Sequence, residues 1–196
     1  MPKLSLNASK KIRHTPAGEI PLDWAWGPAK HLVQSLQSGI SLSGEDRKPE
    51  GNEVALLKVS AVTSGKFLAL EAKAVSQDQS SRLRLSVRKG QILVNRANGS
   101  ARLVGTAVYV HQDCSNTYLP DKLWSVSHEP STASERFLSF VLSWEEFIKQ
   151  VHERSSGGTE MRNISSKAYL QIPVPIPPLP EQRRISAASS SPQSPG

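Results

Sequence analysis

The chain has 196 residues, of which 37% are hydrophobic and 21% are charged, and its single cysteine, Cys114, excludes an internal disulfide and a cysteine-rich zinc site. A formal charge of +7 and a pI near 9.7 make a polyanion a natural partner for at least one face, although many solvated surfaces are basic for no specific reason. No apolar run approaches the length of a membrane span and no secretory signal is visible, so we expect one cytoplasmic domain without a membrane partner.

The first segments predict an arm, a turn and a helix. Residues 1–17 are polar and basic and predict a flexible arm, whereas residues 18–24 (GEIPLDW) predict a turn that ends on a core aromatic residue, Trp24. The next apolar residues recur at helical spacing up to Gly39, a residue type favoured just past a helix end. They are Ala29, Leu32, Val33 and Leu36. We therefore expect a short amphipathic helix here.

The middle of the chain predicts β structure. Residues 41–52 are polar and predict a loop, whose Arg47 and Lys48 could either meet phosphate or face water. Five runs rich in apolar and β-branched residues follow, and residues 63–65 join the first two in the manner of a hairpin. The predicted strands cover residues 54–62, 66–70, 87–95, 104–110 and 122–127.

Residues 137–151 carry the apolar stripe of the main predicted helix. Apolar residues recur there at steps of three and four, and Ser134 can cap the start of the helix. Gly157 and Gly158 then release the chain into a non-helical loop. The stripe consists of Phe137, Val141, Trp144, Ile148 and Val151, widened by Leu138 and Leu142.

Residues 172–185 (IPVPIPPLPEQRRI) change from a proline-rich run to a charged helix start. Proline restricts φ and lacks an N–H, so the run predicts an edge strand or a polyproline segment, and its PxxP spacing also fits a ligand of an SH3-like domain. Pro180 suits the first helical position, and Glu181 and Gln182 suit the first turn. Residues 186–196 contain almost no apolar side chains, so we expect the helix to end after about two turns and the tail to be disordered.

Residues 90–100 place side chains that suit DNA at the end of a predicted strand. Arg96 can pair bidentately with guanine and Asn98 with adenine, while Ser100 and the backbone at Gly99 can hold phosphates. The alternative is a plain hairpin in which Arg96 pairs with a local carboxylate. Both interpretations remain open at this point.

A second candidate contact surface follows the main helix. Glycine lets a backbone approach a phosphate closely, and flanking arginines supply charge. The candidates are Arg154, Gly157, Gly158, Thr159, Arg162 and Asn163. Lys122 is a further candidate for a phosphate contact, and Trp124 is expected inside the core. The alternative is a simple loop that ends the helix.

Catalytic patterns are missing from the sequence. It has no glycine-rich phosphate loop that ends in Lys-Ser/Thr, its five histidines are scattered, and it has no Asn/Asp-Pro-Pro-Tyr/Phe tetrapeptide of a methyltransferase. Asp121 follows Pro120 as in a nuclease metal site, but no Glu-x-Lys comes after it. We therefore expect no catalytic residue, metal or cofactor on this chain.

Five segments, in order along the chain, resemble the specificity subunits of type I restriction-modification systems. They are GEIPLDW (18–24), GQILVNRANG (90–99) with VG (104–105), YLPDKLW (118–124), GGTEMRNI (157–164) and PIPPLPEQRRI (175–185). Gln91 departs from the family pattern, which has an acidic residue at this place. The resemblance spans residues 18–185.

The resemblance implies an α+β fold with a mixed, mainly β core and a few packed helices. Residues 18–178 would form a target-recognition domain that reads one half of a bipartite site in double-stranded DNA. Residues 179–185 would begin a spacer helix that contacts partner subunits. The residues implied in that contact are Pro180, Glu181, Gln182, Arg183, Arg184 and Ile185.

The resemblance also implies a non-catalytic chain. In this family, methyltransferase and restriction subunits carry the S-adenosylmethionine-dependent methylation and the ATP- and Mg-dependent cleavage. Full subunits carry two recognition domains and this chain carries one, so we expect a truncated specificity subunit. The alternatives are the recognition portion of a fused methyltransferase-nuclease, or a truncated remnant or Pro-rich interaction protein without DNA-directing activity.

Overall fold

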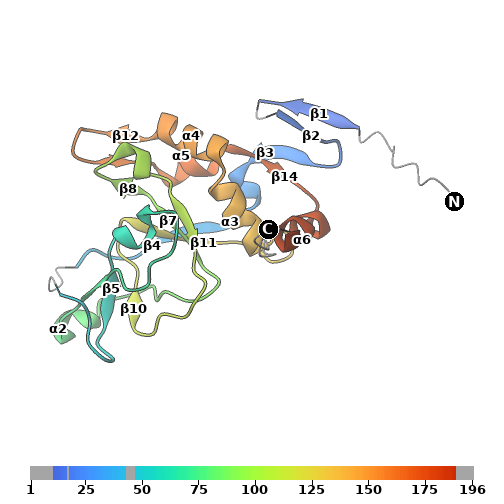
Figure 1. Cartoon of the computed structure of the whole chain (residues 1–196). Helices are drawn as coiled ribbons and strands as arrows, with labels where there is room; N and C mark the ends of the chain where they lie inside the picture. Colours follow the sequence, from blue (N-terminus) through green and yellow to red (C-terminus); the bar gives the residue numbers. More distant parts are fainter. Residues whose placement is uncertain (1–10, 17, 43–46, 189–196) are drawn as a thin grey trace, which may run out of the picture.

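The centre of the protein is a four-stranded antiparallel sheet (Figure 1). The computed structural model describes residues 11–16, 18–42 and 47–188. The strand order is β4 (Ser35–Ser38), β11 (Leu123–Ser127), β7 (Ile92–Asn95) and β9 (Ala107–Tyr109). Together with the helices that pack on this sheet, it confirms the predicted α+β class.

Alternate side chains of the central sheet point into two separate cores. Ile92 and Val94 of β7 join the larger core, whereas Leu93 between them joins the second core on the other face. Figure 1 shows α4 and α5 on one side of the sheet and the segments around β5, β10 and α2 on the other. The helices that contribute to the larger core are α3 (Glu135–Leu142), α4 (Glu145–Arg154) and α5 (Ser166–Leu170).

A small three-stranded sheet covers the second core. β5 (Ala55–Leu57) pairs antiparallel with β6 (Ala72–Ala74) and parallel with β10 (Thr117–Tyr118). Helix α1 (Ser60–Thr63) adds Ala61 and Val62 to the same core, and α2 (Gln77–Ser80) follows β6. A third, smaller cluster forms on the opposite face of β5; its buried members are Leu42, Leu56, Val75 and Leu83.

Segments from both ends of the chain meet in a two-stranded sheet. β14 (Pro173–Ile176) pairs antiparallel with β3 (Ala25–Pro28), which confirms the edge-strand interpretation of the proline run. A hairpin of β1 (Ile12–Thr15) and β2 (Gly18–Pro21) precedes β3. Helix α6 (Leu179–Ala188) follows β14 and packs beside α3 (Figure 1).

The prediction of a helix over residues 29–36 is wrong. Only a 3-10 turn forms, at Ala29–His31, and the strand β4 follows it. The N–H of Gln34 donates to the carbonyl oxygen of Ser127 at 2.8 Å, so pairing with β11 outweighs the local helical pattern. Gly39 ends no helix; a Cβ there would collide with the backbone of a neighbouring segment, so this glycine permits two segments to approach closely.

The hairpin predicted from residues 54–62 and 66–70 is also wrong in detail. The first strand is limited to β5, because residues 60–63 form α1 and bury their apolar side chains as a helix. The antiparallel partner of β5 is β6, which lies beyond residue 70. A short apolar run fits a buried strand and a buried helix equally well, which explains the error.

The main helix predicted over residues 137–151 is two helices, α3 and α4. Between them, the Ser143 hydroxyl donates to the Ser139 carbonyl oxygen at 2.7 Å, and Trp144 is extended with ψ of 138°. Both helices still bury their apolar stripe in the larger core. Ser134 occupies the predicted position before α3, but its side chain makes no capping hydrogen bond.

Trp24 is not a core residue. It is half-buried beside a hollow that Leu22, Lys11 and Glu181 also line, and it belongs to none of the buried clusters of the described residues. The turn that was expected to carry it into the core instead leaves it between the β1–β2 hairpin and α6. The prediction failed because an aromatic residue after a turn can cover a surface junction as well as fill a core.

The predicted arm and tail are only partly described. Strand β1 lies within the predicted arm, and residues 1–10 and 17 lie outside the described residues. At the other end, α6 continues to Ala188, so Ser186, which was expected in the tail, is a buried helical residue. Residues 189–196 lie outside the described residues. Among the described residues, no helix has the length and apolar character needed to cross a membrane.

Candidate nucleic-acid interface

Three two-residue strands bring the two predicted contact stretches together. β13 (Arg162–Asn163) pairs antiparallel with β12 (Ser156–Gly157) on one side and with β8 (Ala97–Asn98) on the other. The labels β8 and β12 lie close together in Figure 1, at the end of the molecule near α4. We call residues 96–102 and 154–163 together the loop edge. About sixty residues separate its two parts in the chain, and the sheet joins them directly.

The β12–β13 turn depends on one glycine. Gly157 has a φ of +131°, a region that residues with a side chain rarely adopt, and a Cβ there would collide with the carbonyl oxygen of Met161. A Cβ at the neighbouring Gly158, in contrast, would meet nothing within 4 Å. The two glycines therefore differ: the first is required by the fold of the turn, whereas the second leaves open space at the surface.

Asn98 and Arg162 lie side by side on the loop edge. They are directly opposite in the β8–β13 pair, so their side chains share one face of the small sheet. The Asn98 Oδ1 accepts from the Ser100 N–H at 2.9 Å, and the Arg162 Nη2 donates to the Ser155 carbonyl oxygen at 3.0 Å. The Arg162 Nε is buried and has no partner among the described residues. One bond fixes each side chain, and donors remain on both.

Arg96 lies against the core beneath the loop edge. Its guanidinium carbon is 5.6 Å from the centre of the Trp124 ring, within the range of a cation–π contact, and Nη1 is 3.5 Å from the Ser38 hydroxyl. Its Nε is buried and has no hydrogen-bond partner in the part of the chain that the structure describes. Among the described residues, no carboxylate pairs with Arg96, so the structure does not contain the carboxylate-paired hairpin.

The other predicted contacts surround these side chains. The N–H of Arg96 donates to the Lys122 carbonyl oxygen at 3.0 Å, which places Lys122 beside β8. Arg154 is exposed at the end of α4, where Nη1 donates to the Gln150 carbonyl oxygen at 3.3 Å. A shallow hollow of about 370 Å³ lies on the loop edge; its lining residues are Gly99, Ala101, Gly157, Gly158, Thr159 and Arg162.

Three residues that the sequence did not single out also shape this edge. Arg102 is exposed in the 3-10 turn Ala101–Leu103, and its signal was a cation next to the predicted stretch. Ser38 reaches Arg96 from β4, which no local pattern could reveal. Asn95 is fully buried, and its Nδ2 donates to the Leu103 carbonyl oxygen at 2.8 Å, which holds the base of the loop that follows β7.

Gln182 of α6 is buried inside the domain. Its Oε1 accepts from the N–H of Ser134 at 2.9 Å, and its Nε2 donates to the carbonyl oxygens of Thr132 and Pro177 at 3.1 and 3.0 Å. These bonds hold α6 against the start of α3. The side chain was expected to contact a partner subunit, but it is only 1% exposed, so the exposed residues of α6 are better placed for that role.

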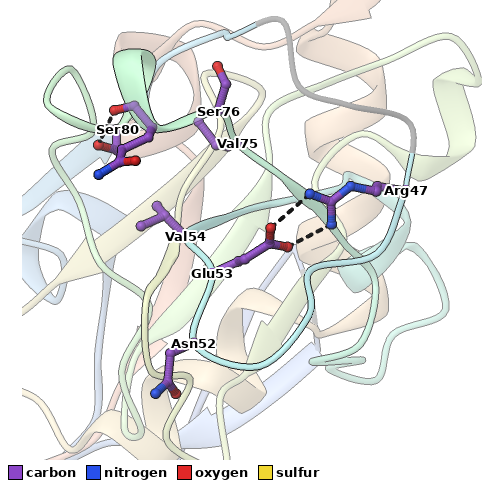
Figure 2. A pocket seen from close by; sticks show the side chains of 8 residues that line it. Arg47, Asn52, Glu53, Val54, Val75, Ser76 and Ser80 are labelled. Atoms are coloured by element: carbon purple, nitrogen blue, oxygen red, sulfur yellow. Dashed lines mark hydrogen bonds and ion pairs between the residues drawn. The ribbon is translucent and has the colours of Figure 1, made fainter.

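A second hollow, of about 400 Å³, lies away from the loop edge beside β6 and α2 (Figure 2). Figure 2 shows Arg47 pointing at Glu53, and its two Nη atoms donate to the two carboxylate oxygens at 2.6 and 2.8 Å. The hydrogen bonds from Arg47 lower the pKa of Glu53 to about 2. Because this guanidinium already pairs with a carboxylate, the hollow offers little to a phosphate.

The polar groups of the loop edge are mostly amides, guanidinium groups and hydroxyls. Among the described residues, no three His, Cys, Asp or Glu side chains gather in a way that could bind a metal ion. Glu160 is the only carboxylate in residues 154–163, against two arginines. The chemistry of the edge is therefore hydrogen bonding by amide, guanidinium, hydroxyl and backbone N–H groups.

Comparisons with known proteins agree on one family. A model of the family described as "Type I restriction modification DNA specificity domain" matches residues 40–188. The chain is 25% identical over 169 residues to the specificity subunit of the type I restriction enzyme EcoEI from Escherichia coli; the match covers 85% of this chain and 28% of that subunit.

Solved structures agree on the fold. The S subunit of a type I restriction-modification system from M. genitalium has a TM-score of 0.56 at 16% identity, over 96% of this chain and 41% of that one. The HsdS subunit from Thermoanaerobacter tengcongensis has a TM-score of 0.57 at 19% identity, over 90% of this chain and 38% of that one. The chain thus spans less than half the length of these relatives.

Proposed function

Since the chain belongs to the family of type I restriction modification DNA specificity domains, we propose that it binds double-stranded DNA and recognises one half of a bipartite target. In this proposal it directs methyltransferase and restriction subunits to that target. The observation that carries the proposal is the β8–β13 pair, which sets an amide and a guanidinium side by side at an accessible edge.

The side chains of Asn98 and Arg162 carry the hydrogen-bond donors and acceptors that recognition of base edges requires. In the major groove, Arg pairs with guanine O6 and N7, and Asn pairs with adenine N6 and N7. We propose that Arg162 and Asn98 make such contacts, because each is held by one bond to the backbone and neither has a carboxylate partner among the described residues. Arg96 was predicted to read a base; its packing on Trp124 supports a role in holding the edge in place as well.

The surrounding groups suit phosphates. Backbone N–H groups and hydroxyls position a protein on the duplex without reading sequence, and Gly or small residues allow the close approach that this needs. We propose this role for Gly99, Ser100, Gly157, Gly158, Thr159 and Asn163, together with the cations Lys122, Arg154 and Arg102. Their contribution to affinity should fall steeply with salt.

Catalysis in this proposal lies on other chains. S-adenosylmethionine, ATP and Mg would be bound by the methyltransferase and restriction subunits, in a cytoplasmic complex. We propose that α6 meets those subunits through its outward residues Pro180, Arg183 and Arg184, whereas Ile185 packs partly against the larger core. The Glu181 carboxylate accepts two bonds from Arg184, at 2.8 and 2.6 Å, which orders this exposed face.

Selection from a pool of randomised duplexes by the full chain tests the proposed function. We expect one short motif to be enriched, and we expect Asn98→Ala and Arg162→Ala to lose the preference at different base positions. Arg154→Ala is the matched comparison, because loss of a phosphate contact should weaken binding to all duplexes alike. If duplexes bound by the wild-type chain contain no enriched motif, the proposal of sequence recognition is wrong.

A further inference from the structure

The positive charge of the chain is concentrated in one segment. Residues 79–112 contain six arginines or lysines and no aspartate or glutamate. The other residues carry 18 basic and 17 acidic side chains, so six of the seven net charges belong to this segment. Two of the six cations, Arg96 and Arg102, lie on the loop edge described above. The other four precede β7 and lie outside the loop edge; they are Arg82, Arg84, Arg88 and Lys89.

These four cations lie on an extended segment that is anchored from behind. Apolar side chains alternate with the basic ones: Leu83 and Val87 are buried and Leu85 is half-buried, and each packs in one of the two smaller clusters. All four cations are exposed. We call residues 82–89 the basic strip. Its alternation is that of a half-buried strand, which puts its charges on the outer face.

Backbone hydrogen bonds fix the basic strip on β10. The N–H of Val87 donates to the Thr117 carbonyl oxygen at 2.8 Å, and the N–H of Leu119 donates to the Leu85 carbonyl oxygen at 2.8 Å. Between these bonds, Ser86 pairs with Tyr118 in an isolated antiparallel bridge. The charges are therefore carried by an ordered surface of the domain and not by a loose tail.

The side chains of the basic strip have no acidic partner among the described residues. Arg84 donates only to the carbonyl oxygen of Ser81, at 3.4 Å, and Arg88 donates to the Ser86 hydroxyl at 3.0 Å. The Asp113 carboxylate instead accepts from the backbone N–H of Lys89, at 3.3 Å. Four cations within eight residues, exposed and without ion pairs, attract an external anion.

We propose that the basic strip is a second DNA-binding surface, which holds phosphates of the same duplex that the loop edge reads. This inference rests on the proposed function. Lys89 and Arg96 are seven positions apart in the sequence, a distance of at most about 25 Å in an extended chain. Duplex DNA carries about one charge per 1.7 Å of its axis, so a segment of that length presents on the order of fifteen phosphates. One duplex can therefore reach both surfaces.

The composition of the strip favours the duplex backbone over single-stranded nucleic acid. Proteins that hold single strands stack bases on aromatic side chains, and residues 82–89 contain no aromatic residue. The strip also lacks the Asn, Gln or carboxylate groups that would read base edges along with its arginines. Its contribution should accordingly be independent of sequence.

The test compares two fourfold variants of the full chain with equal net charge. The first replaces the strip cations by Arg82→Gln, Arg84→Gln, Arg88→Gln and Lys89→Gln. The control replaces four exposed cations elsewhere, by Arg13→Gln, Lys30→Gln, Lys66→Gln and Lys149→Gln. Circular dichroism and thermal melting establish that both fold, and binding to a duplex of arbitrary sequence is measured at several salt concentrations, starting at low salt.

We expect the strip variant to lose about three to four units of the slope of log affinity against log salt, and the control to keep the wild-type slope. Equal salt slopes for the two variants would show that the basic strip does not bind phosphates. Failure of the wild-type chain to bind any duplex at low salt would also contradict the proposal. Selection separates this from the proposed function. If only the proposal for the basic strip is wrong, the wild-type chain enriches a motif, and the strip variant enriches the same motif with the salt slope of the control. If only the proposal of sequence recognition is wrong, the wild-type chain enriches no motif, but the strip variant still has a smaller salt slope than the control.

Discussion

The loop edge and the basic strip lie at opposite ends of β7, and they hold their cations differently. On the loop edge, Arg96 and Arg162 are half-buried and contact Trp124 and the Ser155 carbonyl oxygen. On the basic strip, the cations are exposed and carry no ion pairs among the described residues. Reading a base edge needs a donor fixed to within a fraction of an ångström, whereas attraction of phosphates needs only charge near the backbone. These differences support the proposed arrangement, in which the loop edge provides sequence preference and the basic strip provides general affinity for DNA.

The two regions also depend on different parts of the fold. The loop edge rests on the larger core through Trp124, whose ring meets that of Tyr169 edge-on at 5.5 Å. The basic strip rests on the two smaller clusters across the central sheet. A substitution in the larger core should therefore affect the loop edge first, and a substitution in the smaller clusters should affect the basic strip first.

The largest effect is expected for Trp124→Ala. Removing this buried ring should destabilise the protein by about 3–5 kcal/mol, because it leaves a cavity and removes the support of Arg96. Urea unfolding measures the loss, and Trp124→Phe, which keeps an aromatic ring, should cost clearly less. In Trp124→Ala, backbone amide hydrogen exchange should accelerate most on the loop edge. If it accelerates equally in residues 82–89, the two regions do not rest on separate cores.

A smaller effect is expected for Gly157→Ala, with Gly158→Ala as its control. The first substitution places a side chain at a φ of +131° and against the Met161 carbonyl, so it should cost on the order of 1–3 kcal/mol. The second meets open space and should be close to neutral. Thermal melting of both variants checks this. In low-salt binding, the first variant should lose its sequence preference but keep its general affinity; two glycine variants with the same stability would show that the turn does not need this conformation.

The smallest effect on stability is expected on the basic strip. Arg84→Gln removes an exposed cation that has one long bond to a backbone carbonyl, so stability should change by less than about 0.5 kcal/mol. The free energy of unfolding at low salt is the measurement. A loss above 1 kcal/mol would mean that the strip is held by its charges and not by Leu83, Leu85 and Val87.

Much of the fold could be predicted from sequence because it depends on local patterns. The strands β7, β9 and β11 fall within predicted strands, and α3 and α4 carry the predicted stripe. The helix over residues 29–36 could not be rejected locally, because the pairing of β4 with β11 involves residues almost ninety positions away. The break between α3 and α4 lies inside a continuous apolar stripe, so the spacing of apolar residues gave no sign of the extended backbone at Trp144.

The sequence predicted the two parts of the candidate site, but it did not predict that they lie next to each other. Residue types singled out both stretches of the loop edge but left a plain hairpin and a plain helix-ending loop as alternatives, and the resemblance then favoured the contact interpretation. The register that sets Asn98 opposite Arg162 exists only in the folded sheet, as does the packing of Arg96 on Trp124. Charge counting could have found the basic strip, but its exposure and its anchoring on β10 needed the structure.

In the proposed arrangement, the loop edge supplies the preference for one DNA sequence and the basic strip supplies affinity for any duplex. The most direct test is the ratio of affinities for a selected duplex and for one with the same bases in permuted order, measured for the wild type, Arg162→Ala, Arg162→Lys and the fourfold strip variant. Arginine can form a bidentate pair with guanine and lysine is a point charge, so we expect both Arg162 variants to lose about 1–3 kcal/mol of preference. The strip variant should bind both duplexes more weakly at an unchanged ratio. If Arg162→Ala and Arg162→Lys fold normally and keep the wild-type ratio, Arg162 does not read the target and the division between the two regions is wrong.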